Sequence, residues 1–209
     1  MPRIFVPETL TLTQLVVFPA AEPPPYTELY EALQKQLQAG DAKNAQKVAE
    51  TLYTVAKASN APYLAALAQL YIADLIRHRH SHALAQLQQA NALFYNDSRA
   101  IARYHEALGY YLQGLIHCAQ NNVAQLSATF GRARQLLNQL QDRWQHYGKP
   151  TFPFQDLIRW IDDLTNLSIF TPNSRSLNIV PSYEFNAEKT LDFRGGTALG
   201  DIEIALPRS

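Results

Sequence analysis

The sequence predicts a mainly α-helical fold in which antiparallel helices stack as hairpins. From Tyr26 to Phe170, apolar residues recur almost without a break at the i, i+3, i+4, i+7 spacing of amphipathic helices. Glycine, proline and short polar residues separate these periodic stretches, so the expected helices follow one another through short turns. The two ends of the chain differ from the middle. We therefore expect three parts: an extended or strand segment at 1–25, a helical domain at 26–170, and an extended or β tail at 171–209.

The first four expected helices are short and closely connected. The first begins at Tyr26 and ends before Gly40, and Asp41 is placed to cap the second. Pro62 suits the first turn of the third helix, and Ser81 is the expected cap of the fourth. Their core-facing positions carry leucine, alanine and aromatic side chains, namely Leu33, Leu37, Ala45, Ala49, Leu52, Ala56, Leu64, Leu67, Tyr71, Ala83, Leu87, Ala90 and Phe94.

The next helices are longer. The fifth is expected after the caps Asp97 and Ser98, and its apolar stripe consists of Ile101, Tyr104, Leu108, Leu112, Leu115 and Ala119. The apolar residues of the sixth are spaced alternately by three and four, and they are Val123, Leu126, Phe130, Ala133, Leu137, Leu140, Trp144 and Tyr147. Such a seam favours lengthwise packing on a neighbouring helix. Pro153 opens a seventh helix, and Pro172 follows its end.

Small or apolar residues recur where successive hairpins would cross. The corresponding positions are Ala45, Ala83 and Leu126, followed four residues later by Ala49, Leu87 and Phe130. Together with the turn in "LQAGDAKNAQKVAETLYTVA" and the pair Leu108-Gly109 in "ALGYYLQG", this pattern resembles the tetratricopeptide-like helical repeat. The resemblance covers residues 26–147. It implies a short α-solenoid that holds a protein or peptide in a concave groove.

The two ends of the chain show strand-like patterns. Residues 9–18, "TLTLTQLVVF", alternate polar and apolar side chains, and "LNIV", "SYEF", "KTLDF" and "DIEIAL" follow Pro172. Neither end has enough apolar surface to form a core alone. We expect a minor β or extended element in which both ends pack on the helices. The alternative is that the C-terminal tail adds a strand to a partner's sheet.

Charge and cysteine content exclude several classes of protein. The 18 basic and 18 acidic residues cancel, so no long-range field attracts nucleic acid or an anionic membrane surface. Cys118 is the only cysteine, which rules out an internal disulfide and suits a reducing compartment. No stretch reaches the roughly 18 consecutive apolar residues of a membrane helix, and Glu8 interrupts the apolar residues that an export signal would need. We expect a cytoplasmic protein.

One histidine cluster is a candidate for metal chemistry. The potential ligands in "DLIRHRHSH" are Asp74, His78, His80 and His82. Arg77 and Arg79 alternate with the histidines and would repel a cation, and the cluster lies where one helix ends and the next begins. A metal-dependent enzyme built on the three histidines is therefore a weak alternative, and we expect no metal or cofactor.

A polar row on the fifth expected helix is the strongest candidate for binding. Its residues lie opposite the apolar stripe, and arginine and tyrosine are enriched in protein interfaces. In a tetratricopeptide-like stack, the first helix of each hairpin lines the groove, so the resemblance places this row there. The row consists of Arg103, Glu106, Tyr110, Gln113 and His117. Arg77 and Trp160 complete the expected set of partner-binding residues.

These observations predict a non-enzymatic scaffold or adaptor that binds a protein or peptide through the groove or the C-terminal tail. No hydrolase, phosphate-loop or zinc-protease motif occurs in the sequence. The alternative from another class is a nucleic-acid-binding helical repeat, which would use Arg77, Arg79, Arg99, Arg103, Arg132 and Arg134. Zero net charge disfavours it. The identity of the partner and the oligomeric state stay open.

Overall fold

The computed structural model describes residues 12–19, 25–120, 122–147, 157–159, 161–162 and 165. Over these residues the protein is mainly α-helical and contains no strand, as the periodicity predicts for the middle of the chain. The named helices are α1 (Leu12–Leu15), α2 (Tyr26–Gln38), α3 (Ala42–Ala58), α4 (Pro62–Leu75), α5 (His80–Tyr95), α6 (Ala100–Ala119) and α7 (Val123–Tyr147). The expected C-terminal tail at 171–209 lies outside the described residues.

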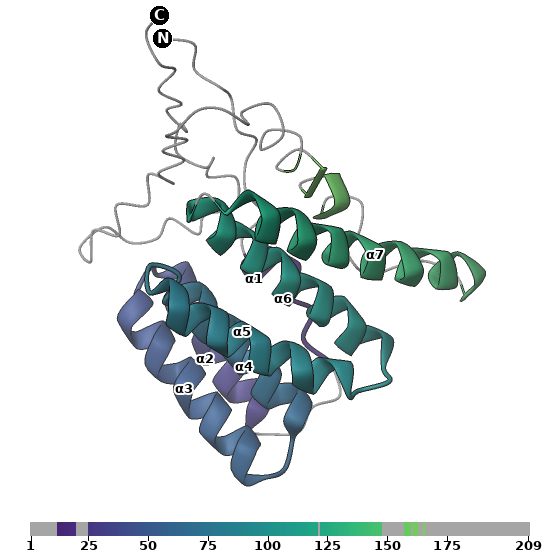
Figure 1. The fold of residues 1–209 in the computed structure, drawn as a ribbon. Helices are drawn as coiled ribbons and strands as arrows, with labels where there is room; N and C mark the ends of the chain where they lie inside the picture. Colours follow the sequence, from purple (N-terminus) through teal and green to yellow (C-terminus); the bar gives the residue numbers. More distant parts are fainter. Residues whose placement is uncertain are drawn as a thin grey trace, which may run out of the picture.

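Each helix from α2 to α7 packs against the next one along the chain. The connections at 39–41, 59–61, 76–79 and 96–99 are too short for a crossover, so the helices that they join run antiparallel. In Figure 1, α6 and α7 form an adjacent pair at one end of the stack, and α2 and α3 lie toward the other end. The helix α4 also contacts α6, which makes it central to the core.

The turn between α2 and α3 has the geometry that its sequence predicts. Gly40 adopts a left-handed φ of 72°, and the backbone N–H of Asp41 donates to the carbonyl of Gln36 at 2.9 Å, which closes the end of α2. The side chain of Asp41 accepts the backbone N–H of Asn44 at 3.0 Å and so caps α3. Asn60 occupies the equivalent left-handed position after α3, with φ of 53°.

The left-handed turn gives a matched pair of substitutions. Gly40→Ala is expected to lower the free energy of unfolding by about 1 to 2 kcal/mol, because a Cβ disfavours positive φ. Asn60→Gly relaxes the same constraint and is expected to stabilise the protein slightly. Urea unfolding of both variants measures the two effects. If Gly40→Ala were as stable as the natural chain, the left-handed conformation at this position would be wrong.

The expected caps of α5 and α6 are wrong. α5 begins at His80 with Arg79 as its N-cap, so Ser81 lies inside the first turn. α6 begins at Ala100 after Arg99, and no side chain caps it. The carboxylate of Asp97 accepts hydrogen bonds from Arg99 instead. Nearby polar groups compete for the side chain that could cap a helix. Here the guanidinium of Arg99 binds the carboxylate of Asp97, which the sequence predicted as a cap.

The predicted strand at 9–18 is wrong for Leu12–Leu15, which form one helical turn. The backbone N–H of Val16 closes this turn by donating to the carbonyl of Leu12 at 2.9 Å. Leu12 and Leu15 are three residues apart and both are buried. A helical turn places such a pair on the same side, whereas a strand would place them on opposite faces. Burial of both leucines therefore favours the turn over the alternating pattern.

The helix α4 is buried on nearly every side. Twelve of its 14 residues are buried, because α3 and α5 flank it and α2 and α6 also contact it. The amphipathic helix α3 contrasts with it, since one side of α3 is exposed at Lys43, Lys47, Glu50 and Lys57. A helix that is apolar all round belongs in the interior of a helical stack.

Two glycines of α6 allow close approach of its neighbours. A Cβ built at Gly109 would lie 2.0 Å from Oδ1 of Asn91 in α5, and one built at Gly114 would lie 2.1 Å from Cε1 of Phe130 in α7. The helix therefore presents a bare backbone toward both adjacent helices. Small residues at such crossings let two helix axes come closer together.

Candidate partner-binding surface

Side chains from α2, α4 and α6 meet on one side of the stack and form what we call the inner surface. Its residues are Tyr30, Gln34, Tyr63, Tyr71, Tyr104 and His105. Gln34 Nε2 donates to Tyr71 Oη at 2.8 Å and thereby joins α2 to α4. Tyr63 Oη lies 3.1 Å from His105 Nδ1 and joins α4 to α6. Helices that are not consecutive in sequence are thus linked by polar contacts.

Residues 12–19 of the same chain lie on the inner surface. Tyr104 Oη donates to the carbonyl oxygen of Leu15 at 2.8 Å, and the backbone N–H of Val17 donates to His105 Nε2 at 3.3 Å. The ring of Phe18 stacks on Tyr30 with centroids 4.1 Å apart and planes 12° apart. The segment therefore reaches from α6 to α2. Leu15 is only 1% exposed, so the segment completes part of the core.

His105 is neutral and its tautomer follows from its partners. A backbone N–H can only donate, so His105 Nε2 accepts the hydrogen bond from Val17 and the ring proton lies on Nδ1, facing Tyr63 Oη. Burial lowers the pKa of His105 from 6.5 to about 3, although the backbone of Ile101 favours the charged form. Burial likewise raises the pKa of the Tyr104 hydroxyl. Both groups are hydrogen-bonding elements and not proton carriers near neutral pH.

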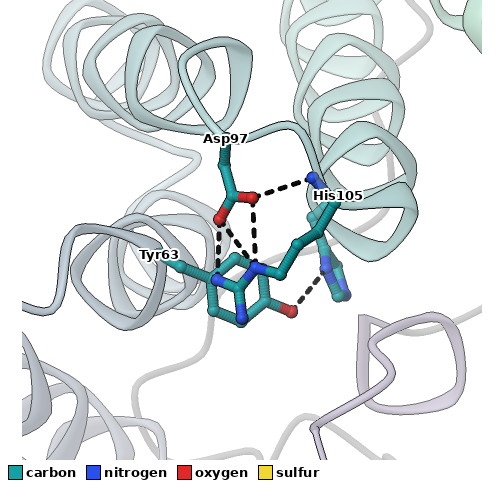
Figure 2. A network of polar contacts seen from close by, with 4 residues as sticks. Tyr63, Asp97 and His105 are labelled. Carbon is teal, nitrogen blue, oxygen red and sulfur yellow. Dashed lines mark hydrogen bonds and ion pairs between the residues drawn. The ribbon is translucent and has the colours of Figure 1, made fainter.

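A polar network borders the inner surface at the start of α6 (Figure 2). Both carboxylate oxygens of Asp97 accept hydrogen bonds from the guanidinium of Arg99, the shortest at 2.6 Å from Nη2. This ion pair holds the pKa of Asp97 below its usual range. The guanidinium lies over the ring of Tyr63, with Cζ 4.4 Å from the centroid. Asp97 thus orients Arg99 on one face of Tyr63, while the hydroxyl of Tyr63 binds His105.

The predicted polar row of α6 does not line the inner surface. Glu106 is 1% exposed and Gln113 is 7% exposed, so the expectation of an exposed row is wrong at both positions. On a helix of about 100° per residue, both lie between the directions of Gly109, which faces α5, and Gly114, which faces α7. Tyr110 lies on the same side and is half-buried. The row therefore points toward the two flanking helices.

Arg103 has a structural role that the sequence did not show. Its Nη1 donates to Oε2 of buried Glu106 at 2.7 Å, and its Cζ lies 4.8 Å from the centroid of the exposed Tyr95 ring. The guanidinium thus neutralises a buried carboxylate and also reaches the protein surface.

Arg103→Ala is accordingly expected to lower the free energy of unfolding by about 1.5 kcal/mol, because Glu106 would keep a buried charge without its partner. Adding Glu106→Gln to this variant removes the charge and is expected to restore part of the loss. Arg132→Ala, which breaks an exposed contact with Gln135, is the matched control and should have little effect. Chemical unfolding measures all three, and equal stability of the two arginine variants would contradict the structural role.

Of the other predicted binding residues, Arg77 and His117 lie on different elements. Arg77 follows α4, and its Nε pairs with Oδ1 of Asp74 at 2.9 Å. His117 is half-buried near the end of α6, and Trp160 lies outside the described residues.

The residues considered for metal binding and for nucleophilic chemistry do not form a site in the described parts of the chain. His78 and His82 are exposed around the start of α5, and in the parts of the chain that the structure describes no three His, Cys, Asp or Glu side chains are placed to hold a metal ion. Burial raises the pKa of the Cys118 thiol to about 11, so it is protonated near neutral pH. A half-buried thiol that stays protonated is a poor nucleophile.

Most of the arginines proposed for nucleic-acid binding already have protein partners. Arg77 pairs with Asp74, Arg99 with Asp97, Arg103 with Glu106 and Arg134 with Asp162, and Arg132 bonds Gln135. Carboxylates beside the guanidinium groups reduce the local positive potential that phosphate binding requires.

The inner surface does not follow from the helical pattern, because two of its tyrosines occupy positions typical of the apolar core. Tyr71 and Tyr104 occupy stripe positions in the sequence, and each carries a hydroxyl that needs a hydrogen-bond partner when buried. His105 directly follows Tyr104. Tyrosines that recur on the apolar faces of alternate helices were therefore an available signal for polar contacts inside the stack.

Scans against models of protein families, curated proteins and solved structures found no match. The described helices also include none that combines the length and the apolar character needed to span a membrane. What can be inferred about function therefore rests on the geometry of the chain itself.

Proposed function

We propose that the protein is a non-enzymatic scaffold or adaptor that binds a protein or peptide partner. The observation that supports this most directly is the way in which the inner surface holds residues 12–19. Tyr104 and His105 hydrogen-bond main-chain atoms of the segment, and Tyr30 stacks on its aromatic side chain. A helical stack that binds an irregular chain segment in this way has the contacts needed to bind a polypeptide.

A tetratricopeptide-like solenoid is part of this proposal. In that arrangement α2, α4 and α6 are the first helices of three successive hairpins and line the concave side. The contacts from Tyr71 to α2 and from Tyr63 to α6 support such an arrangement, because they join alternate helices. The small residues Ala45, Ala49 and Ala83 are fully buried, as the crossing of stacked hairpins requires.

A cytoplasmic adaptor of this kind acts by bringing a partner to a defined place. Its binding residues would come from the inner surface and from exposed side chains at its border. Arg103 remains a candidate, since its guanidinium lies over the exposed Tyr95 and this pair of residue types is common in interface hot spots. The C-terminal tail is a second candidate element for binding the same partner.

The decisive experiment uses the full chain as immobilised bait in a nuclease-treated extract. We expect a protein partner that forms a stoichiometric complex in size-exclusion chromatography with light scattering. Cross-linking with mass spectrometry then locates the contact on this chain. Turnover in a broad hydrolase screen would contradict the proposal. A salt-dependent electrophoretic shift of single-stranded RNA or DNA, with loss of every complex after nuclease treatment, would favour nucleic-acid binding instead.

A further inference from the structure

We propose that residues 12–19 are an internal competitor for the inner surface, and that the external partner presents a peptide of the same chemistry. This inference rests on the proposed function, since it specifies what that surface binds and how access is regulated. The segment presents Leu12 and Leu15 on one helical turn, then Val16, and then Phe18. We therefore expect a partner segment with leucine-like residues three apart, followed three residues later by an aromatic residue.

Two hydrogen bonds allow the inner surface to bind peptides of different sequence. Tyr104 binds a carbonyl oxygen and His105 binds a backbone N–H, which are groups that almost every peptide carries. The spacing between them is specific, because the carbonyl belongs to Leu15 and the N–H to Val17. A partner that places a carbonyl and an N–H two residues apart after a helical turn satisfies the donor on Tyr104 and the acceptor on His105.

The apolar contacts supply the preference for side chains. Leu12, Leu15 and Val16 are buried, while Val17 and Phe18 are half-buried. The ring of Phe18 stacks on Tyr30, whose own hydroxyl lies 3.3 Å from Tyr71 Oη. An aromatic residue at this position of a partner would stack on Tyr30 in place of Phe18. Charged residues at the two leucine positions are excluded, because burial would remove their solvation.

The internal segment can be displaced because little of its structure is self-supporting. α1 is a single helical turn, which is too short to be stable by itself, and it is held by the contacts with the inner surface. Tethering gives the segment an effective concentration on the order of millimolar. A free peptide at micromolar concentration therefore binds the natural chain weakly, and it binds strongly only when the internal segment is weakened.

The test uses a fluorescein-labelled synthetic peptide of residues 10–19 and the full-length chain. Fluorescence anisotropy compares the natural chain with a chain that carries Leu12→Ser and Leu15→Ser, whose fold is checked by circular dichroism. We expect the peptide to bind the variant at least about tenfold more tightly, because its competitor is weakened. Adding Tyr104→Phe is expected to reduce that binding by about three- to tenfold, since one hydrogen bond to the peptide backbone is lost. A scrambled peptide of the same composition is the control.

If the double variant loses its helical structure, the proposal is tested with a milder variant and with the natural chain. Phe18→Ala removes only the stack on Tyr30 and should raise peptide affinity by a smaller factor. In the natural chain, hydrogen exchange should be faster for the amides of residues 15–18 than for the interior amides of α4, since local release of the segment exposes only the former. Exchange of both regions at one common rate would show that the segment leaves the surface only in global unfolding, and the proposal would fall.

The outcomes separate this inference from the proposed function. The competition is refuted if the peptide binds neither the Leu12→Ser and Leu15→Ser chain nor the Phe18→Ala chain. It is also refuted if adding Tyr104→Phe leaves peptide binding unchanged. In either case residues 12–19 are a permanent part of the core. A captured partner that cross-links elsewhere on the chain would leave the adaptor function intact. Failure to capture any protein, with tight peptide binding retained, would instead count against the adaptor function alone.

Discussion

Replacing Gly114 by alanine is expected to lower the free energy of unfolding by about 2 to 3 kcal/mol. The new Cβ would lie 2.1 Å from Cε1 and 2.3 Å from Cδ1 of Phe130, far inside van der Waals contact. Phe130 is buried, and its ring stacks on Tyr111 with centroids 6.0 Å apart, so it has little room to move away. Alanine is the better helix former by about 1 kcal/mol, which offsets only part of this overpacking.

Two other glycines provide controls for Gly114→Ala. Gly131 of α7 is exposed with no atom within 4 Å of a built Cβ, so Gly131→Ala should stabilise the protein by about 0.5 to 1 kcal/mol. Gly109→Ala meets the end of the Asn91 side chain, which can rotate, so its cost should be smaller than that of Gly114→Ala. Adding Phe130→Leu should restore part of the stability lost in Gly114→Ala. Thermal or urea unfolding that ranks Gly131→Ala as the most damaging change would refute the predicted packing of α6 on α7.

Acidification is expected to destabilise the protein through His105. The pKa of this residue is about 3 in the folded protein and 6.5 in the unfolded chain, because burial disfavours the charged ring. Between these values the unfolded state binds the extra proton, so the free energy of unfolding falls by about 1.4 kcal/mol for each pH unit below 6.5. Between pH 6.5 and pH 4.5 the contribution of His105 to the free energy of unfolding falls by roughly 2 kcal/mol. Above pH 6.5 it is fully present.

The variant His105→Gln isolates this contribution. Glutamine does not titrate but keeps an acceptor for the N–H of Val17, so the dependence of stability on pH should be shallower in the variant. Asp74 has the opposite effect on the free energy of unfolding. Burial raises the pKa of this carboxyl, so acid stabilises the folded protein through Asp74. Both proteins contain Asp74, so its effect cancels in the comparison. Parallel curves of unfolding free energy against pH for the two proteins would contradict the buried neutral state of His105.

The bounds of the helices could be predicted because local rules determine them. Gly40, Asp41 and Pro62 act on the backbone within one turn of their own positions, and the structure places α2, α3 and α4 accordingly. The same rules failed at Ser81 and Asp97. At Asp97 a second local partner, the guanidinium of Arg99, competes for the carboxylate.

The orientation of α6 could not be predicted, because a helical wheel does not show how many neighbours a helix has. An amphipathic pattern implies one buried face and one exposed face, whereas α6 packs between α5 and α7 and also contacts α4. Glu106 and Gln113 thus became buried polar residues, and Tyr104 and His105 faced another part of the same chain. The contact with residues 12–19 depends on a fold-level meeting of distant segments. No local pattern in those residues specifies it.

The burial of α4 on nearly every side has a consequence for the divergence of this protein over evolution. Surface helices accumulate changes at exposed positions, but α4 offers only Pro62 as an exposed site and Asp74 as a partly exposed one. Between them, any lysine, arginine or glutamate would enter the core without a partner. A descendant of this chain could therefore lose recognisable similarity along α3 and still retain an uncharged stretch at residues 63–73. That stretch, together with glycines at the positions of Gly109 and Gly114, is the pattern by which distant members of such a lineage could be found.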